Sequence, residues 1–190
     1  MSERKKEDLR VIKTLDAIRG AFREMICEMD YDQISIKELT DRARINRKTF
    51  YLHYESLNAL LEELQDEIVE SFLSQNVSYR SMADIKRSIR HFFEYAAAMP
   101  KLNERLLSSG SYQHVGDKIN QKIMAQQAIR NKGAFSDDPL TDNLVFVYFG
   151  ANSTLLYRQW VKDGKQMPIE QLIEVATHLI CDGLAAFVKS

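Results

Sequence analysis

The chain has 190 residues, enough for one large domain or two small ones. It contains only seven glycines and three prolines. This scarcity disfavours the all-β classes, because sandwiches and barrels need these residues at many corners. A hydrophobic fraction of 45% beside 28% charged residues excludes wholesale disorder, and the formal net charge of −1 argues against a protein that is basic all over.

The N-terminal segment and the apolar runs bear on the compartment. The segment MSERKKEDLR lacks the uninterrupted apolar stretch of a secretory signal, and the apolar runs elsewhere are too short to span a membrane. Cys27 and Cys181 lie far apart and are interpreted as buried, reduced thiols. We therefore expect a cytoplasmic protein that makes no membrane contact.

The first third of the chain carries local signals for helices. Apolar residues at steps of three and four predict a first helix over residues 9–29. Ser35 is followed three positions later by Glu38, a capping box that predicts a second helix from Ile36 to about Ala43.

A third short helix is predicted directly after a tight turn. Asn46 is a favourable N-cap for a helix that begins at Arg47, so only residues 44–46 separate the two short helices. Ser56 can cap a fourth helix, whose apolar stripe reaches Phe72.

The rest of the chain is also predicted to be helical. Apolar periodicity indicates helices over 83–98, in two pieces within 101–132, over 140–162, and from Pro168 onward. The segment GAFSDDP, residues 133–139, is the clearest loop. The predicted fold class is therefore all-α.

The segment from Ile36 to Tyr54 has the dimensions of a helix-turn-helix unit, two helices joined by three or four residues. Residues 35–54 carry a charge of +3, while residues 1–54 sum to +2 and the remainder to −3. The near-neutral total thus averages a basic N-terminal part and an acidic remainder. A helix-turn-helix unit presents its second helix to the major groove of DNA.

Side chains of this unit are candidate DNA contacts. Arg47 and Lys48, at the start of the third helix, can reach base edges, and guanine is the favoured partner of arginine. Hydroxyl and imidazole groups nearby can donate to phosphate oxygens. The full candidate set is Lys37, Arg44, Asn46, Arg47, Lys48, Thr49, Tyr51, His53 and Tyr54. The alternatives are a solvated helix face for Arg47 and Lys48 and core packing for Tyr51.

The stretch ISIKELTDRARINRKTFYLHYESLNALLEEL resembles the N-terminal DNA-binding region of the TetR/AcrR family of bacterial regulators. The resemblance covers about residues 9–73 and implies a supporting helix at 36–43 and a recognition helix at 47–52. It further implies an N-terminal three-helix DNA-binding domain at 1–55, a connecting fourth helix at 56–74, and a helical effector and dimerisation domain at 75–190. The segment 148–171 is similar to a subgroup that includes regulators of dihydroxyacetone-type kinase operons.

Two positions depart from the family pattern. The family usually has glycine in the turn, where this chain has Arg44, so the turn is either shifted or strained. The family also often has lysine at the start of the fourth helix, where this chain has Leu57, so one phosphate contact is expected to be missing.

The resemblance implies a ligand-responsive regulator, a repressor that binds a near-palindromic double-stranded DNA operator as a homodimer. The two recognition helices of such a dimer enter successive major grooves about 34–36 Å apart. The dimer interface is expected in residues 140–162 and 169–188, with a small-molecule effector of unknown identity bound in the same domain. The alternative is a coactivator that kept the fold and acts through a partner protein, which Arg44 and Leu57 favour.

Other chemistry-bearing residues give weaker signals. Aromatic residues that could line the effector pocket, or simply form core, are Phe92, Tyr95, Tyr112, Phe146, Phe149 and Tyr157. His178 and Cys181 could share one face of the last helix, but two ligands do not make a metal site, so no metal is expected. The sequence lacks a phosphate-binding glycine loop, a nucleophile elbow and an HExxH motif, so neither a cofactor nor an enzyme is expected.

Overall fold

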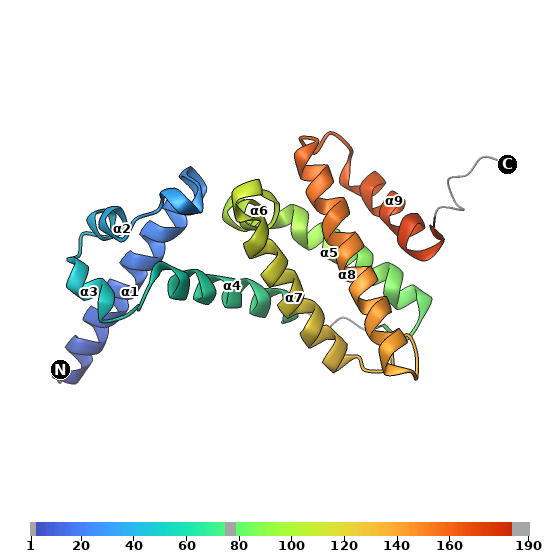
Figure 1. The fold of residues 1–190 in the computed structure, drawn as a ribbon, viewed down its shortest axis with the longest axis horizontal. Helices are drawn as coiled ribbons and strands as arrows, with labels where there is room; N and C mark the ends of the chain where they lie inside the picture. Colours follow the sequence, from blue (N-terminus) through green and yellow to red (C-terminus); the bar gives the residue numbers. More distant parts are fainter. Residues whose placement is uncertain (1–2, 75–78, 184–190) are drawn as a thin grey trace. The chain divides into compact units, whose positions relative to one another are not determined.

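The computed structural model describes residues 3–74 and 79–183, with side chains from Leu9 onward, and these residues form an all-helical fold without β-strands (Figure 1). The helices follow the order α1 (Glu3–Glu28), α2 (Ile36–Arg42), α3 (Arg47–Tyr51), α4 (Leu57–Leu73), α5 (Met82–Ala98), α6 (Lys101–Ser108), α7 (Gln113–Arg130), α8 (Pro139–Lys162) and α9 (Ile169–Cys181), with short 3₁₀ turns at Tyr31–Gln33 and Gly110–Tyr112. The predicted all-α class is confirmed. Within the described ranges, no helix is both long and apolar enough to cross a bilayer.

The chain divides into two compact units, an N-terminal unit, Met1–Glu67, and a C-terminal unit, Ile68–Ser190. The division falls inside α4, so the helix predicted to connect two domains at 56–74 contributes to both of them. Each unit has its own buried core.

The start of α2 follows from the residues that precede it. The Ser35 hydroxyl accepts a hydrogen bond from the Glu38 backbone N–H at 3.2 Å, which satisfies one of the free donors at the helix start. The Glu38 carboxylate instead accepts from Arg42 at 2.8 Å. The serine half of the predicted capping box forms, while the glutamate reaches forward along the helix.

The starts of α3 and α4 are capped as predicted. The Asn46 side chain accepts from the Thr49 backbone N–H at 2.8 Å, and the Ser56 hydroxyl accepts from that of Ala59 at 3.2 Å. The α1 helix begins at Glu3, before the predicted start at residue 9. The polar segment ahead of residue 9 is rich in lysine and glutamate, which are good helix formers, but it has no apolar stripe, so apolar periodicity could not predict this first part of the helix.

The core of the N-terminal unit joins α1, α2 and α3. Phe22 and Ile26 of α1, Leu39 of α2 and Phe50 of α3 are each at most 1% exposed. Phe50 also contacts the ring of Tyr54 at a centroid distance of 5.8 Å. The short α2 and α3 are therefore held by packing on α1 and on each other rather than by their own length.

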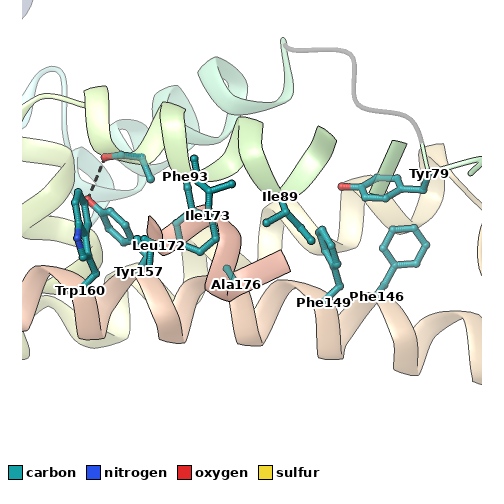
Figure 2. Packing of buried hydrophobic residues seen from close by; sticks show 11 residues of the cluster. Tyr79, Ile89, Phe93, Phe146, Phe149, Tyr157, Trp160, Leu172, Ile173 and Ala176 are labelled. Atoms are coloured by element: carbon teal, nitrogen blue, oxygen red, sulfur yellow. Dashed lines mark hydrogen bonds between the residues drawn. The ribbon is translucent and has the colours of Figure 1, made fainter. Parts of the chain in front are cut away.

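The core of the C-terminal unit is built around α8, which packs against α5, α6, α7 and α9. Figure 2 shows its buried side chains lying in a row between α5, α8 and α9. At one end, the Tyr157 hydroxyl donates to the Ala96 carbonyl at 3.1 Å, and the Trp160 indole N–H donates to the Met167 carbonyl at 2.7 Å. Both buried aromatic residues thus satisfy their polar atoms inside the unit.

A buried carboxylate fixes the loop that precedes α8. The Asp142 oxygens accept hydrogen bonds from the backbone N–H groups of Gly133 and Phe135, both at 2.9 Å. The bonds from Phe135 and Gly133 hold the pKa of Asp142 below its usual range. The predicted loop at 133–139 is therefore tied to the first turn of α8.

Replacing Asp142 by asparagine is expected to lower the thermal midpoint of the protein at pH 7, because one of the two accepting oxygens becomes an amide donor. The folded pKa is lowered, so the stabilisation is present above the ordinary carboxyl value of 3.8 and is lost as the pH falls through the folded pKa. The difference in thermal midpoint between the wild-type protein and Asp142→Asn should therefore become smaller below pH 3.8. Thermal unfolding followed by circular dichroism measures it.

Asp137 supplies the matched control, because it is exposed in the same loop. The Asp137→Asn substitution removes the same charge and should leave the midpoint nearly unchanged at every pH. An equal effect of both substitutions would mean that charge alone matters and that the two backbone bonds do not fix the loop.

Candidate nucleic-acid interface and ligand cavity

The turn between α2 and α3 is closed by two nested backbone hydrogen bonds. The Ile45 N–H donates to the Thr40 carbonyl at 3.0 Å, and the Arg44 N–H donates to the Asp41 carbonyl at 3.2 Å. This pairing is the Schellman motif, which needs a left-handed residue after the helix. Arg44 takes that place with a φ of 54°. Of the two alternatives left by the sequence, the turn is strained rather than shifted.

Replacing Arg44 by glycine is expected to stabilise the protein by about 1 kcal/mol, because a left-handed residue with a Cβ costs roughly that much. Arg44→Ala is the control, since it removes the guanidinium but keeps the Cβ and should give no such gain. Urea unfolding followed by circular dichroism measures both. Equal stability of the two variants would show that the backbone conformation is not the source of strain.

The exposed residues of α3 form the candidate interface. Arg47 and Lys48 are both exposed at the start of the helix. The Arg47 guanidinium lies 6.0 Å from the ring centroid of Tyr51, which is itself half exposed. This cation–π contact orients the arginine along the helix surface and leaves its donors available. Lys37 of α2 and Arg44 of the turn are exposed as well.

The basic residues of this unit are not equivalent. Arg42 bonds to Glu28 at 2.6 Å and to Glu38 at 2.8 Å, and these two bonds raise its pKa. Arg42 therefore links α1 to α2. It has this structural role although its charge is included in the +3 of residues 35–54. Within the described part of the chain, no ion pair is found for the candidate cations Lys37, Arg44, Arg47 and Lys48.

The remaining candidates are partly or wholly engaged. Asn46 is exposed but serves as the cap of α3, and the Thr49 hydroxyl donates to its side chain at 3.0 Å. His53 is half-buried. Tyr54 lies in the core, 6% exposed, and its hydroxyl donates to the Glu63 carboxylate at 3.1 Å. We therefore leave Tyr54 out of the interface, because neither its ring nor its hydroxyl is open to a phosphate.

Two charged side chains, Arg19 and Glu63, lie beside the Tyr54 hydroxyl. Glu63 also accepts from Arg19 of α1 at 2.5 Å, so α1, Tyr54 and α4 share one hydrogen-bonded group. Burial raises the pKa of the Tyr54 hydroxyl. A sequence pattern could not separate this tyrosine from Tyr51, because both rings contact Phe50 and only the burial of Tyr54 and its bond to Glu63 distinguish them.

The C-terminal unit encloses a cavity of about 50 Å³ between its helices. Four of the six predicted pocket aromatics line it, namely Phe92, Tyr95, Phe149 and Tyr157. Tyr79 also lines it, and burial raises the pKa of Tyr79 to about 12. Polar lining side chains that the sequence gave no reason to select are Ser88, His91, Asn120, Ser153 and Thr154.

The other two predicted pocket aromatics lie elsewhere in the core. Tyr112 is fully buried beneath the Arg105 guanidinium, which lies 5.7 Å from its ring centroid. Phe146 packs edge-on against Phe135 and Tyr79, with centroid distances of 4.8 and 5.4 Å. These two rings lie outside the lining of this cavity and pack as core, the alternative that the sequence left open for them.

Among the side chains described, no three His, Cys, Asp or Glu residues come together as a metal site. His178 pairs through Nδ1 with Asp182 at 2.8 Å, on the last turn of α9. Cys27 and Cys181 are free thiols of intermediate burial.

Comparison with known proteins places the fold in a class. No family model matches the chain. Over 66 residues it is 39% identical to an uncharacterised HTH-type transcriptional regulator of Bacillus subtilis, YxbF. That match covers 33% of this chain and only 17% of the length of the relative.

The solved structures agree over nearly the whole chain. A TetR transcriptional regulator from Streptococcus agalactiae superimposes with a TM-score of 0.70 at 20% identity, covering 94% of this chain and 99% of that one. NalD of Pseudomonas aeruginosa, a secondary repressor of a multidrug efflux pump, gives 0.67 at 16% identity over 92% and 96%. FadR of Bacillus subtilis, solved with stearoyl-CoA, gives 0.61 at 16% identity over 88% and 97%.

The chain therefore has the all-helical fold of the TetR-type transcriptional regulators, with a helix-turn-helix unit at its N-terminal end. The predicted resemblance is confirmed at this level. Its finer assignment to a subgroup with dihydroxyacetone kinase operon regulators stays a prediction.

Proposed function

We propose that this protein is a TetR-type transcriptional regulator that binds double-stranded DNA through α3. The observation that carries the proposal is the start of α3, where a capped helix presents Arg47 and Lys48 to solvent. The N-terminal residues of a recognition helix are the ones that meet base edges in the major groove. The proposed contacts are Lys37, Arg44, Asn46, Arg47, Lys48, Thr49, Tyr51 and His53.

Fluorescence anisotropy with the full chain tests this proposal. The labelled duplex carries the DNA directly upstream of the gene, and a scrambled duplex of equal composition is the control. We expect specific affinity that is at least a hundredfold tighter than for the scrambled duplex, with a logarithmic salt slope set by the phosphate contacts. Equal affinity for both duplexes would contradict a regulator acting at this DNA.

A second candidate function is that of a coactivator that acts through a partner protein. Two observations favour it, the strained left-handed Arg44 and the half-buried Leu57 at the first position of α4, where the family often has a phosphate-binding lysine. Absence of any DNA binding at low salt, with a folded protein, would favour the coactivator over the regulator.

We further propose that the regulator is a homodimer through 140–162 and 169–188, of which residues 184–188 lie outside the described part. An apolar row on α8 supports this, because four of its large side chains are each more than half exposed: Leu140, Leu144, Val147 and Leu155. Their spacing places them along one side of the helix. A contiguous exposed apolar stripe of this kind marks an association surface in a protein.

Replacing Leu144 and Leu155 by glutamate is expected to convert a dimer into a monomer, since charges buried in an apolar interface cost several kcal/mol. Sedimentation equilibrium measures the mass, and Ile129→Glu, at an equally exposed leucine-sized residue of α7, is the control. If wild-type protein is already monomeric, or if the double variant stays dimeric, the proposed interface is wrong.

In this proposal the protein acts in the cytoplasm as a repressor that responds to a small molecule, and not as an enzyme. The ligand would occupy the cavity of the C-terminal unit and favour a dimer whose two recognition helices no longer match successive major grooves. Such a ligand can shift the equilibrium between the DNA-binding and the non-binding form of the dimer only by the difference in its affinity for the two forms.

A further inference from the structure

The cavity of the C-terminal unit contains one polar atom whose burial is unexplained by the fold. His91 of α5 lines the cavity, and its Nε2 atom is buried without a hydrogen-bond partner among the described residues. A buried polar atom left unpaired destabilises the folded protein, because it has lost its hydrogen bonds to water. Such an atom in a cavity lining indicates a partner that is not part of the chain.

Several other polar groups of the lining are engaged within the protein. The Thr154 hydroxyl donates to Asn120 Oδ1 at 3.1 Å, and the Ser153 hydroxyl donates to the Phe149 carbonyl at 2.9 Å. The hydroxyls of Tyr95 and Ser71 lie 3.0 Å apart, and the Tyr157 hydroxyl donates to a backbone carbonyl. His91 Nε2 is the lining atom that is buried without a hydrogen-bond partner among the described residues, so a ligand donor or acceptor gains a hydrogen bond there.

The charge of the lining restricts the ligand. No Asp, Glu, Lys or Arg belongs to the lining residues that the structure describes, which are mainly aromatic and aliphatic. An ionised ligand would have no fixed counter-charge there, and an unpaired buried charge is strongly unfavourable. A neutral, mainly apolar molecule with one hydroxyl fits, because a hydroxyl can donate to or accept from the imidazole nitrogen, whichever tautomer is present.

The size of the cavity depends on one flexible side chain. Its volume of about 50 Å³ is a third of the roughly 150 Å³ at which an engineered apolar cavity holds benzene. The thioether of Met124 lies against the backbone of Gly150, where a Cβ would overlap it, and both residues line the cavity. Methionine is unbranched and changes rotamer readily. Displacement of Met124 would open space for a single ring.

We propose that this cavity binds a small, neutral, mainly apolar molecule through a single hydroxyl that hydrogen-bonds with His91 Nε2, with Met124 moving aside to admit it. The inference rests on the proposed effector function and names the chemistry of its ligand. The ring-bearing lining residues Phe92, Tyr95 and Phe149 suit an aromatic or compact aliphatic body.

Isothermal titration of the full chain with four probes of one ring size tests the proposal. Phenol carries the hydroxyl, toluene lacks it, and benzoate and benzylammonium carry opposite charges. We expect phenol to bind about five- to tenfold more tightly than toluene, the worth of one hydrogen bond. Both charged probes should bind at least tenfold more weakly than phenol. Tightest binding by a charged probe, or no binding by phenol, overturns the proposal.

Two variants and one spectroscopic measurement locate the site. His91→Phe keeps the ring and removes the nitrogen, so the preference for phenol over toluene should vanish, whereas an unchanged preference overturns the proposal. Met124→Ala should bind both phenol and toluene more tightly than the wild-type protein does, because the space is then already open. Should a variant fail to fold, the imidazole ¹⁵N shift of His91 in wild-type protein must change with phenol and stay constant with toluene.

DNA anisotropy separates this inference from the proposed function. Residue 91 lies outside the N-terminal unit, so the His91→Phe variant should bind DNA with the same affinity as the wild-type protein. Phenol binding that depends on His91 supports the cavity chemistry even where DNA affinity does not respond, and only the effector role then fails. Intact DNA binding without His91-dependent phenol binding overturns the cavity inference and leaves the DNA-binding proposal standing.

Discussion

Replacing Arg47 and Lys48 together by alanine is expected to weaken binding of the upstream DNA by about a hundredfold or more. Both side chains are exposed at the start of α3, and the guanidinium of Arg47 is oriented by the ring of Tyr51. A good contact from such a residue to a base edge contributes about 1–3 kcal/mol, and two of them give the stated factor. Fluorescence anisotropy at several salt concentrations measures the loss.

The control must remove the same charge elsewhere. Arg80→Ala with Lys86→Ala also removes two exposed basic residues, but from the C-terminal unit. We expect this control to change affinity by less than about threefold, since neither residue belongs to the unit that carries the proposed DNA contacts. A loss of equal size in both double variants would mean that overall charge, and not the α3 surface, determines binding. Circular dichroism should report unchanged folding for both.

The salt dependence distinguishes reading of bases from contact with phosphates. Each phosphate contact that is lost lowers the logarithmic salt slope by about 0.9. If Arg47 and Lys48 meet base edges, affinity falls for the specific duplex, while the slope and the affinity for the scrambled duplex change little. If they meet phosphates, both affinities fall together and the slope decreases by about two.

The parts of the fold that were predictable are those fixed by local chemistry. Ser35, Asn46 and Ser56 satisfy backbone donors three residues away, so the starts of α2, α3 and α4 follow from short sequence windows. The turn was only partly predictable, because the sequence left a shifted or a strained turn open and the φ of 54° at Arg44 decides for the strained one. Local geometry thus determines most of the candidate DNA-binding surface.

The parts that were not predictable depend on neighbours in other helices. Tyr51 and Tyr54 are three residues apart, yet only Tyr54 is buried, because Glu63 of α4 accepts its hydroxyl. Tyr112 is separated from the cavity in the same way, beneath Arg105. The role of His91 arises where its helix meets α7 and α8, and no spacing within α5 announces it.

Phe50→Ala is expected to destabilise the N-terminal unit by about 3–5 kcal/mol, the range for removing a fully buried phenylalanine. Phe50 is 0% exposed and lies in α3, a helix of five residues that is far too short to persist without packing. A small domain has only about 5–15 kcal/mol of stability, so this loss is a large share. DNA binding should therefore disappear because α3 is no longer formed, although Arg47 and Lys48 remain in the chain.

The single tryptophan makes this prediction specific to one unit. Trp160 is buried in the C-terminal unit, so its fluorescence reports unfolding there, while circular dichroism reports both units. In Phe50→Ala we expect part of the helical signal to be lost at lower urea, with the Trp160 transition unmoved. Leu52→Ala, two residues along but 80% exposed, should change stability by no more than about 0.5 kcal/mol. A Trp160 transition that moves together with the helical signal would show that the two units unfold as one, and the destabilisation could not then be assigned to the N-terminal unit alone.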